Sequence, residues 1–365
     1  MNKQISAYLD VVRLLCCLVV LFAHVELNWV PGVTRFFIPL GNECLAVLFV
    51  LSGFVIGFVS DSRETTLKSY LIHRAARVYS LLIPCVVFGF VLDSVGKHFM
   101  TLYYMTGSWP PLNSDPVEFL QALFGFTLLG EVWGCDYFPG SMAPYWTLPY
   151  EVAYYLVFGF AWYLRGWRRL VVPVVFALAI GPSVMMFLPL WLIGMVVYRL
   201  SHRLQLGVRA GRAIFFSGLA LALLAERGAA RAHFHFGFGD QQSPELWPFY
   251  AAGIWFGIVT LGFCFADLKI SRYCGWAKWG AGASATLYLL HFPLARFVNG
   301  LIPFTWPLGV RWVLLVAIVL AGSAAVAAIG ERRKEAWRRG IEAAVTRLQG
   351  ARARALPPFA AKAEP

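Results

Sequence analysis

The sequence predicts an all-α integral membrane protein with about ten transmembrane helices and both termini in the cytoplasm. Three observations support this fold class. Of the 365 residues, 59% are hydrophobic and only 14% are charged, whereas soluble globular chains carry about a quarter charged residues. Apolar runs near the length of about 20 residues that crosses a bilayer recur along the chain. The basic residues gather in alternate connections between these runs, as they do in cytoplasmic loops.

Eleven apolar segments are candidates for the spans. In chain order they cover about residues 8–29, 42–60, 80–97, 117–130, 145–164, 170–187, 188–200, 211–226, 247–265, 281–299 and 310–330. The segment 117–130 is short for a span and lies between acidic and Gly/Pro-rich stretches. Leaving this segment outside the membrane gives ten crossings and brings the basic connections to one side.

The charged connections set the expected orientation. Basic clusters follow the segments 42–60, 145–164, 188–200 and 310–330, whereas residues 98–143 contain acidic side chains and no lysine or arginine. Positive charge is expected on the cytoplasmic side of the membrane. The formal net charge of +12 therefore indicates membrane orientation, and we expect no nucleic-acid partner.

Two segments are expected outside the spans. Residues 65–79 alternate basic and apolar positions at helical spacing, which suits a helix in the cytoplasmic interface. Residues 331–365 follow the last span as a short basic cytoplasmic tail, so residues 1–330 form one polytopic membrane domain. The first apolar segment is too long for a signal peptide and is expected to be retained.

The ionisable residues of the first span are the first candidates for a functional site, because charge is costly at bilayer depth. Arg13 and His24 are 11 positions apart, a separation that returns to one helix face with a rise of about 16 Å. Asp10 precedes Arg13 by three positions and is able to pair with it. In the alternative interpretation, Arg13 extends to the inner interface and His24 is a polar residue at the outer boundary.

Two further ionisable residues lie in apolar segments. Glu151 has apolar and aromatic neighbours on both sides, so its partner must come from another helix. His291 is a candidate for the same cavity, or else a histidine bonded to helix backbone. A histidine with a carboxylate in a cavity of low dielectric can act as a general base. His233 and His235 lie in a polar connection that we interpret as a solvated loop, and no metal is expected.

Five motifs resemble, in order and spacing, those of the membrane acyltransferase 3 family, whose members O-acylate bacterial surface glycans and related acceptors. The motifs are YLDVVRLLCCLVVLFAH at 8–24, LFVLSGF at 48–54, YLIHRAARVY at 70–79, WTLPYEVAYY at 146–155 and SATLYLLH at 284–291. The resemblance covers roughly residues 5–330. The chain departs from the family pattern at Ala46, where many members have an acidic residue, and at Ser80, where a proline is common.

The resemblance implies an O-acyltransferase, with acetyl as the expected acyl group, in the bacterial cytoplasmic (inner) membrane. It implies acyl-coenzyme A, such as acetyl-CoA, as cytoplasmic co-substrate, no permanently bound cofactor, and a hydroxyl of a cell-surface or exported glycan as acceptor. His24 and Glu151 become the catalytic candidates. His24 would deprotonate the acceptor or accept the acyl group itself, and Glu151 would hold or charge-balance a catalytic group. The candidates for binding the donor or the substrate are Arg13, Asp10, Arg74, Arg77, Trp146 and His291.

Two alternatives stay open at this point. Arg74 and Arg77 are suited to the donor's phosphates, because guanidinium groups bind phosphate by bidentate contacts, and equally to anionic lipid headgroups. A secondary transporter that exports a glycan or a lipid-linked intermediate would also need buried charges along a path. Such transporters often show inverted repeats with broken helices, and the sequence has no such symmetry. The motifs therefore favour the acyltransferase.

Overall fold

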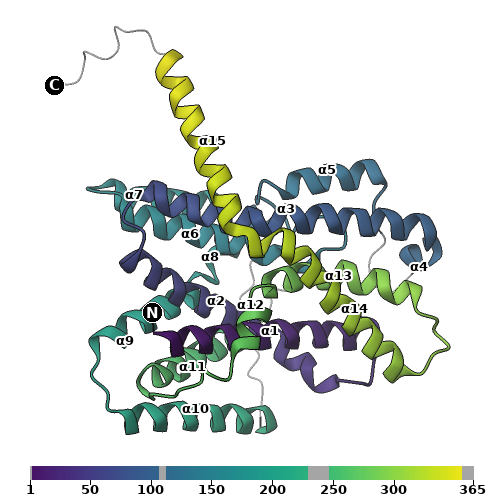
Figure 1. Ribbon diagram of the computed structural model, residues 1–365, viewed down its shortest axis with the longest axis horizontal. Helices are drawn as coiled ribbons and strands as arrows, with labels where there is room; N and C mark the ends of the chain where they lie inside the picture. Colours follow the sequence, from purple (N-terminus) through teal and green to yellow (C-terminus); the bar gives the residue numbers. More distant parts are fainter. Residues whose placement is uncertain (1, 107–111, 229–245, 356–365) are drawn as a thin grey trace.

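The computed structural model describes residues 2–106, 112–228 and 246–355 of the chain (Figure 1). Within these ranges the chain is helical and contains no strand, which confirms the predicted all-α architecture. His233 and His235, with the polar connection that contains them, lie outside the described residues.

The chain begins with three long helices. α1 (Lys3–Asn28) and α2 (Ile38–Ser62) correspond to the first two predicted spans and are joined through the short 3-10 helix η1 (Arg35–Phe37). The third, α3 (Leu67–Phe99), is one continuous helix of 33 residues. The separate interfacial helix expected over 65–79 is therefore wrong, because these residues continue directly into the next span. The helix also continues through Pro84, which lies inside it.

The connection after α3 contains only short helices before the next long one begins. These elements are α4 (Thr101–Thr106), α5 (Asp115–Gly125), η2 (Val132–Gly134) and η3 (Ala143–Trp146), followed by the long helix α6 (Thr147–Tyr163). α5 has 11 residues, well short of the 20 or so that a span needs. Its length agrees with the prediction that 117–130 does not cross.

The remainder of the described chain forms further helices. They are α7 (Arg168–Ile180), α8 (Pro182–Met185), α9 (Leu188–Arg203), α10 (Val208–Gly228), α11 (Leu246–Phe265), α12 (Gly275–Ala281), α13 (Ser284–Leu301), α14 (Leu308–Ile329), η4 (Glu331–Arg333) and α15 (Lys334–Ala355). α15 occupies most of the expected basic tail. It packs against α3 and then projects beyond the helical body (Figure 1).

Six segments of the described residues are long and apolar enough to cross a membrane, which agrees with an all-α protein that passes through it several times. They are Lys3–Asn28, Arg35–Ser62, Leu67–Phe99, Pro182–Arg203, Leu246–Phe265 and Leu308–Gly350. The other predicted spans are helical as well, in α6, α7, α10 and α13. Ten crossings and the orientation of the termini stay predictions.

α2 and α9 pack closely because a glycine on each helix faces the other helix's backbone. A Cβ atom on Gly53 would lie 1.8 Å from the carbonyl oxygen of Trp191, and one on Gly194 would lie 1.8 Å from that of Val50. Small residues permit such approach between helices in a membrane. The close packing brings the indole of Trp191 to Ser52, which lies in the same motif as Gly53.

The connection between α5 and α6 is fastened to α3 by a buried carboxylate. Asp93 accepts hydrogen bonds from the backbone N–H and the hydroxyl of Ser141, at 2.8 and 2.7 Å. Gly140 has a φ of +51°, and a Cβ there would lie 2.4 Å from the Asp93 carboxylate, so this turn requires glycine. The attachment positions the following residues, including Trp146, beside α1.

Glu26, a further ionisable residue of the first span, holds the chain at the end of α1. Its buried carboxylate accepts the backbone N–H groups of Gly32, Val33 and Thr34. Buried carboxylates are tolerated where hydrogen bonds replace their hydration. Glu26 therefore has a structural role in the connection to α2.

Candidate functional site

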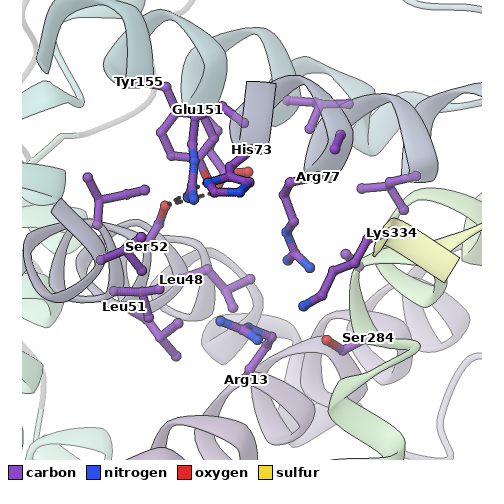
Figure 2. A pocket seen from close by; sticks show the side chains of 18 of the residues that line it. Arg13, Leu48, Leu51, Ser52, His73, Arg77, Glu151, Tyr155, Ser284 and Lys334 are labelled. Carbon is purple, nitrogen blue, oxygen red and sulfur yellow. Dashed lines mark hydrogen bonds between the residues drawn. The ribbon is translucent and has the colours of Figure 1, made fainter. Parts of the chain in front are cut away.

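The larger of two cavities lies among helices from both ends of the chain (Figure 2). Its volume is about 630 Å³, within the range of about 300–1,000 Å³ typical of small-molecule sites. Side chains of α1, α2, α3, α6, α13 and α15 line it. The polar lining near its centre comprises Arg13, Ser52, His73, Arg77, Glu151 and Lys334.

Glu151 lies in this larger cavity and is held by neighbours on two helices. Its Oε1 atom accepts a hydrogen bond from Ser52 Oγ at 2.7 Å and a second from the hydroxyl of Tyr155. Trp191 Nε1 donates to Ser52 Oγ at 3.2 Å, which directs the Ser52 hydroxyl proton toward the carboxylate. No described residue hydrogen-bonds Oε2. One carboxylate oxygen is thus fixed by the protein, and the other is free to bind a ligand.

The two arginines of the YLIHRAARVY motif also line the larger cavity, but each has an acidic partner. Arg74 Nη2 lies 2.9 Å from Glu64 Oε1, which also contacts His73 Nδ1 at 2.7 Å. Arg77 Nη1 lies 3.4 Å from Glu331 Oε1. Arg74 is therefore tied to its own side of the cavity, whereas the longer Arg77 contact leaves most of that guanidinium available.

Arg13 extends from α1 into the larger cavity (Figure 2). The expected ion pair with Asp10 is wrong: no contact within 4.0 Å joins the two side chains. Arg13 points into the cavity instead, where it makes no hydrogen bond and no ion pair within 4.0 Å with a described residue, although the charges of Asp10 and Glu331 act on it from farther away. Asp10 does not line the cavity.

The smaller cavity, of about 280 Å³, contains His24. The rest of its lining is mainly apolar and aromatic, and no lysine, arginine, aspartate or glutamate of the described chain takes part. Trp146, predicted as a binding residue, lines this cavity as well. Leu45 and Tyr288 line both cavities and form a common wall between them. Arg13 and His24 lie at two depths of the same helix, as their spacing predicts, but they line different cavities and not the single one expected.

His24 is hydrogen-bonded to His291, which is fully buried on α13. His24 Nδ1 lies 3.0 Å from His291 Nε2 and 3.0 Å from the carbonyl oxygen of Val20. His291 Nδ1 lies 2.8 Å from the carbonyl of Tyr288 and 3.2 Å from that of Leu287. His291 lines neither cavity, so the expectation that it shares the cavity of Glu151 is wrong. It bonds helix backbone, as the alternative expected, and it also contacts the candidate base.

These contacts determine which ring nitrogens carry protons when both histidines are neutral. Carbonyl oxygens only accept hydrogen bonds, so His291 Nδ1 must be the protonated atom of that ring. Its Nε2 then carries a lone pair and accepts the proton of His24 Nδ1. His24 Nε2 is left with a lone pair and no hydrogen-bonding partner among the described residues. This is the protonation state that a general base requires.

The expectation that His24 and Glu151 share one cavity is wrong, because they line different cavities and no hydrogen bond joins them. A second imidazole, and not a carboxylate, orients His24. Ser52 and Tyr155 were not predicted as site residues, although both lie within the motifs and could have been found there. Lys334 was not predicted either, and no motif marks it.

No group of three or more histidine, cysteine, aspartate or glutamate side chains converges as a metal site within the described ranges. The polar groups of the two cavities are instead suited to an anionic ligand and to proton transfer.

Comparison with known proteins agrees with the composition of the site. Residues 6–328, nearly the whole chain, match the family model of an acyltransferase domain. No curated protein and no solved structure matches the chain. The matched range begins within α1 and ends within α14, before α15 begins.

Proposed function

The chain belongs to the acyltransferase-domain family, and from this premise we propose that it moves an acetyl group from coenzyme A to a hydroxyl of a cell-surface or exported glycan. The observation that carries the proposal is the pair of cavities with a common wall, one basic and one containing His24. The larger cavity receives the thioester donor and the smaller cavity receives the acceptor. Transfer takes place where they meet, at Leu45 and Tyr288.

The charge of the larger cavity supports its assignment to the donor and to the cytoplasmic face. Coenzyme A carries phosphate groups at one end and its thioester at the end of a long pantetheine arm. Arginine and lysine side chains bind phosphate, and basic residues favour the cytoplasmic side of a membrane. In this orientation the enzyme lies in the bacterial inner membrane with both termini in the cytoplasm.

Glu151 is suited to hold the pantetheine arm. Its Oε1 atom is occupied by Ser52 and Tyr155, Oε2 has no hydrogen-bonding partner among the described residues, and the residue lines the cavity. Pantetheine contains two amide N–H groups, and a carboxylate oxygen is a strong acceptor for such donors. Glu151 then acts on the donor's position, and its role does not need contact with His24.

His24 is suited to act as the base at the common wall. The acceptor hydroxyl gives its proton to His24 Nε2 as its oxygen attacks the thioester carbonyl carbon. The carbon–sulfur bond breaks, and the coenzyme A thiolate takes the acceptor's proton from the His24 imidazolium and leaves as the thiol. The imidazolium that forms on His24 keeps its Nδ1–H directed at the lone pair of His291 Nε2, which supports the positive charge.

A covalent route uses the same atom. In that route His24 Nε2 attacks the thioester carbon, coenzyme A leaves, and the acyl-imidazole then passes its acyl group to the acceptor hydroxyl. Incubation with labelled acetyl-CoA and no acceptor distinguishes the two routes. A stable label on His24 supports the covalent one, and an unlabelled His24 under the same conditions supports direct transfer.

The experiment that tests the proposed function uses inverted membrane vesicles, in which the cytoplasmic face is exposed to added acetyl-CoA. We expect vesicles with the protein to convert acetyl-CoA to coenzyme A and to accumulate alkali-labile acetyl ester in their glycan fraction. Vesicles from cells without the gene are the control. Glycan movement across the membrane without any thioester consumption would instead support the transporter, and would overturn the proposal.

A further inference from the structure

Three cationic side chains from distant parts of the chain point into one region of the larger cavity (Figure 2). Arg13 comes from α1, Arg77 from α3 and Lys334 from the first turn of α15. Among the described residues, neither Arg13 nor Lys334 makes a hydrogen bond or an ion pair within 4.0 Å, although the more distant charge of Glu331 acts on both. Arg77 has only the contact of 3.4 Å with Glu331.

The positive charge of this cavity exceeds what its own carboxylates neutralise. Seven lysine and arginine residues line the cavity, against three glutamates. Glu64 is occupied by Arg74, and Glu335 by Arg338 at 2.8 Å. Cations held together without counter-charge repel one another, and an anionic ligand relieves this repulsion. The region around Arg13, Arg77 and Lys334 is therefore built to bind an anion.

The chemistry of the three side chains favours phosphate. Two guanidinium groups offer paired N–H donors, which match the spacing of phosphate oxygens, and the lysine adds a compact positive charge. We infer that Lys334, on the helix that follows the family domain, completes a phosphate site with Arg13 and Arg77 for the nucleotide phosphates of the donor. The inference rests on the proposed function, since it names the donor of that reaction.

The start of α15 is fixed against the membrane domain, which gives Lys334 a defined position. Glu331 accepts the backbone N–H and the hydroxyl of Thr286, each at 3.0 Å, and also contacts Arg77. Gly330 lies against α3, where an added Cβ would be 2.4 Å from the carbonyl oxygen of Ser80. The chain can turn at this point only with glycine. Lys334 is therefore held at the cavity and is not a freely moving tail residue.

The test compares two donors in membranes that contain the full-length protein. Acetyl-CoA carries the nucleotide phosphates, whereas S-acetylpantetheine carries the same thioester without them. We expect Lys334→Gln to raise KM for acetyl-CoA by about tenfold or more, because a hydrogen bond to a charged group is worth about that factor. The KM for S-acetylpantetheine and kcat with either donor stay near the parent values, and Lys334→Arg restores most of the lost affinity.

Arg339→Gln is the matched control, since Arg339 lies on the same helix, is exposed and does not line the cavity. An equal effect of Lys334→Gln on both donors, or none on either, would overturn the inference. A loss that disappears when anionic lipid is omitted from reconstituted vesicles would also overturn it, by assigning the phosphate to lipid headgroups.

A binding measurement separates this inference from the proposed function. Coenzyme A should raise the melting temperature of the purified protein, and Lys334→Gln should weaken that shift at a given concentration. Binding that depends on Lys334 without any acetyl transfer would support the phosphate site and contradict the proposed reaction. Acetyl transfer that does not depend on Lys334 would support the proposed reaction and contradict the phosphate site.

Discussion

The two cavities differ in charge, in size and in the chemistry of their side chains. The larger one, of about 630 Å³, is lined by seven basic residues, whereas the smaller one, of about 280 Å³, contains His24 among apolar and aromatic groups. α1 serves both, through Arg13 at one depth and His24 at the other. Under the proposed function, holding the anionic donor and moving a proton are separate tasks of the two cavities. Substitutions should therefore impair one without the other.

The largest effect is expected from His24→Ala, which removes the base of the smaller cavity and leaves the larger cavity intact. Acetyl transfer should fall by about 10²- to 10⁴-fold, the usual contribution of general acid–base catalysis. The melting-temperature shift caused by coenzyme A should persist. His98→Ala is the control, because His98 is an exposed histidine on α3 that lines neither cavity. Transfer by the His24 variant at the parent rate would show that the base lies elsewhere.

The second effect concerns the connection that forms one wall of the smaller cavity. Burial raises the pKa of Glu131 from its ordinary value of 4.5 to about 7, and the nearby Asp136 adds to the shift. Between these pH values the folded protein binds the proton that the unfolded chain releases, so stability falls as pH rises from about 4.5 to 7. Over this pH range the free energy of unfolding falls by about 3 kcal/mol in all.

Thermal unfolding in detergent between pH 5 and pH 8 checks this prediction. Glu131→Gln stays neutral and should remove most of the pH dependence in this range. Asp136→Asn removes only the nearby negative charge, which is the smaller cause of the raised pKa, and should therefore reduce the pH dependence only in part. A parent protein whose melting temperature does not fall across this interval would contradict the assignment. The same measurement also prevents a loss of stability at high pH from being mistaken for the titration of His24.

Much of the fold follows from the sequence, because most apolar runs of helical length form a helix of their own. The predicted span 170–187 is an exception, since it breaks at Gly181 between α7 and α8. The predicted segments 8–29, 42–60 and 247–265 coincide closely with α1, α2 and α11. The unbroken α3 was not predicted, since periodicity within a segment does not show whether two adjacent segments share one axis.

The candidate site is less accessible to sequence reasoning, because it depends on contacts between helices. The spacing of Arg13 and His24 fixes their common face within α1. Nothing in the sequence shows that His24 meets His291, 267 positions away, and not Glu151. The position of Lys334 depends on the turn at Gly330 and on the packing of α15 against α3. Contacts between residues of different helices depend on how the helices pack, and the sequence pattern within one helix does not show this.

A third and smaller effect is expected at His291, which positions His24 from behind the smaller cavity. His291→Leu removes the lone pair that accepts His24 Nδ1–H. We expect kcat to fall by about ten- to a hundredfold, since a hydrogen bond to a charged group is worth about 1.5–3 kcal/mol.

The conservative variant His291→Gln distinguishes this positioning role from simple packing. Its side-chain carbonyl oxygen is able to accept the same proton, so much of the activity should return. The pH dependence of kcat gives a second readout, because the apparent pKa of His24 should change in His291→Leu and recover in His291→Gln. Equal losses in both variants, with an unchanged pH profile, would reduce His291 to a packing residue.

The smallest effect is expected at the common wall, where the two cavities meet. The common wall consists of Leu45 and Tyr288, and Leu45→Ala shortens the first of these side chains, which leaves space for a longer acyl group beside Tyr288. Because burial of one methylene is worth about 0.8 kcal/mol, kcat/KM for longer donors should rise about fourfold per methylene relative to acetyl-CoA. Leu48→Ala is the matched control, since Leu48 lines only the larger cavity. A change of donor preference in Leu48→Ala and not in Leu45→Ala would place the transfer point inside the larger cavity, away from His24.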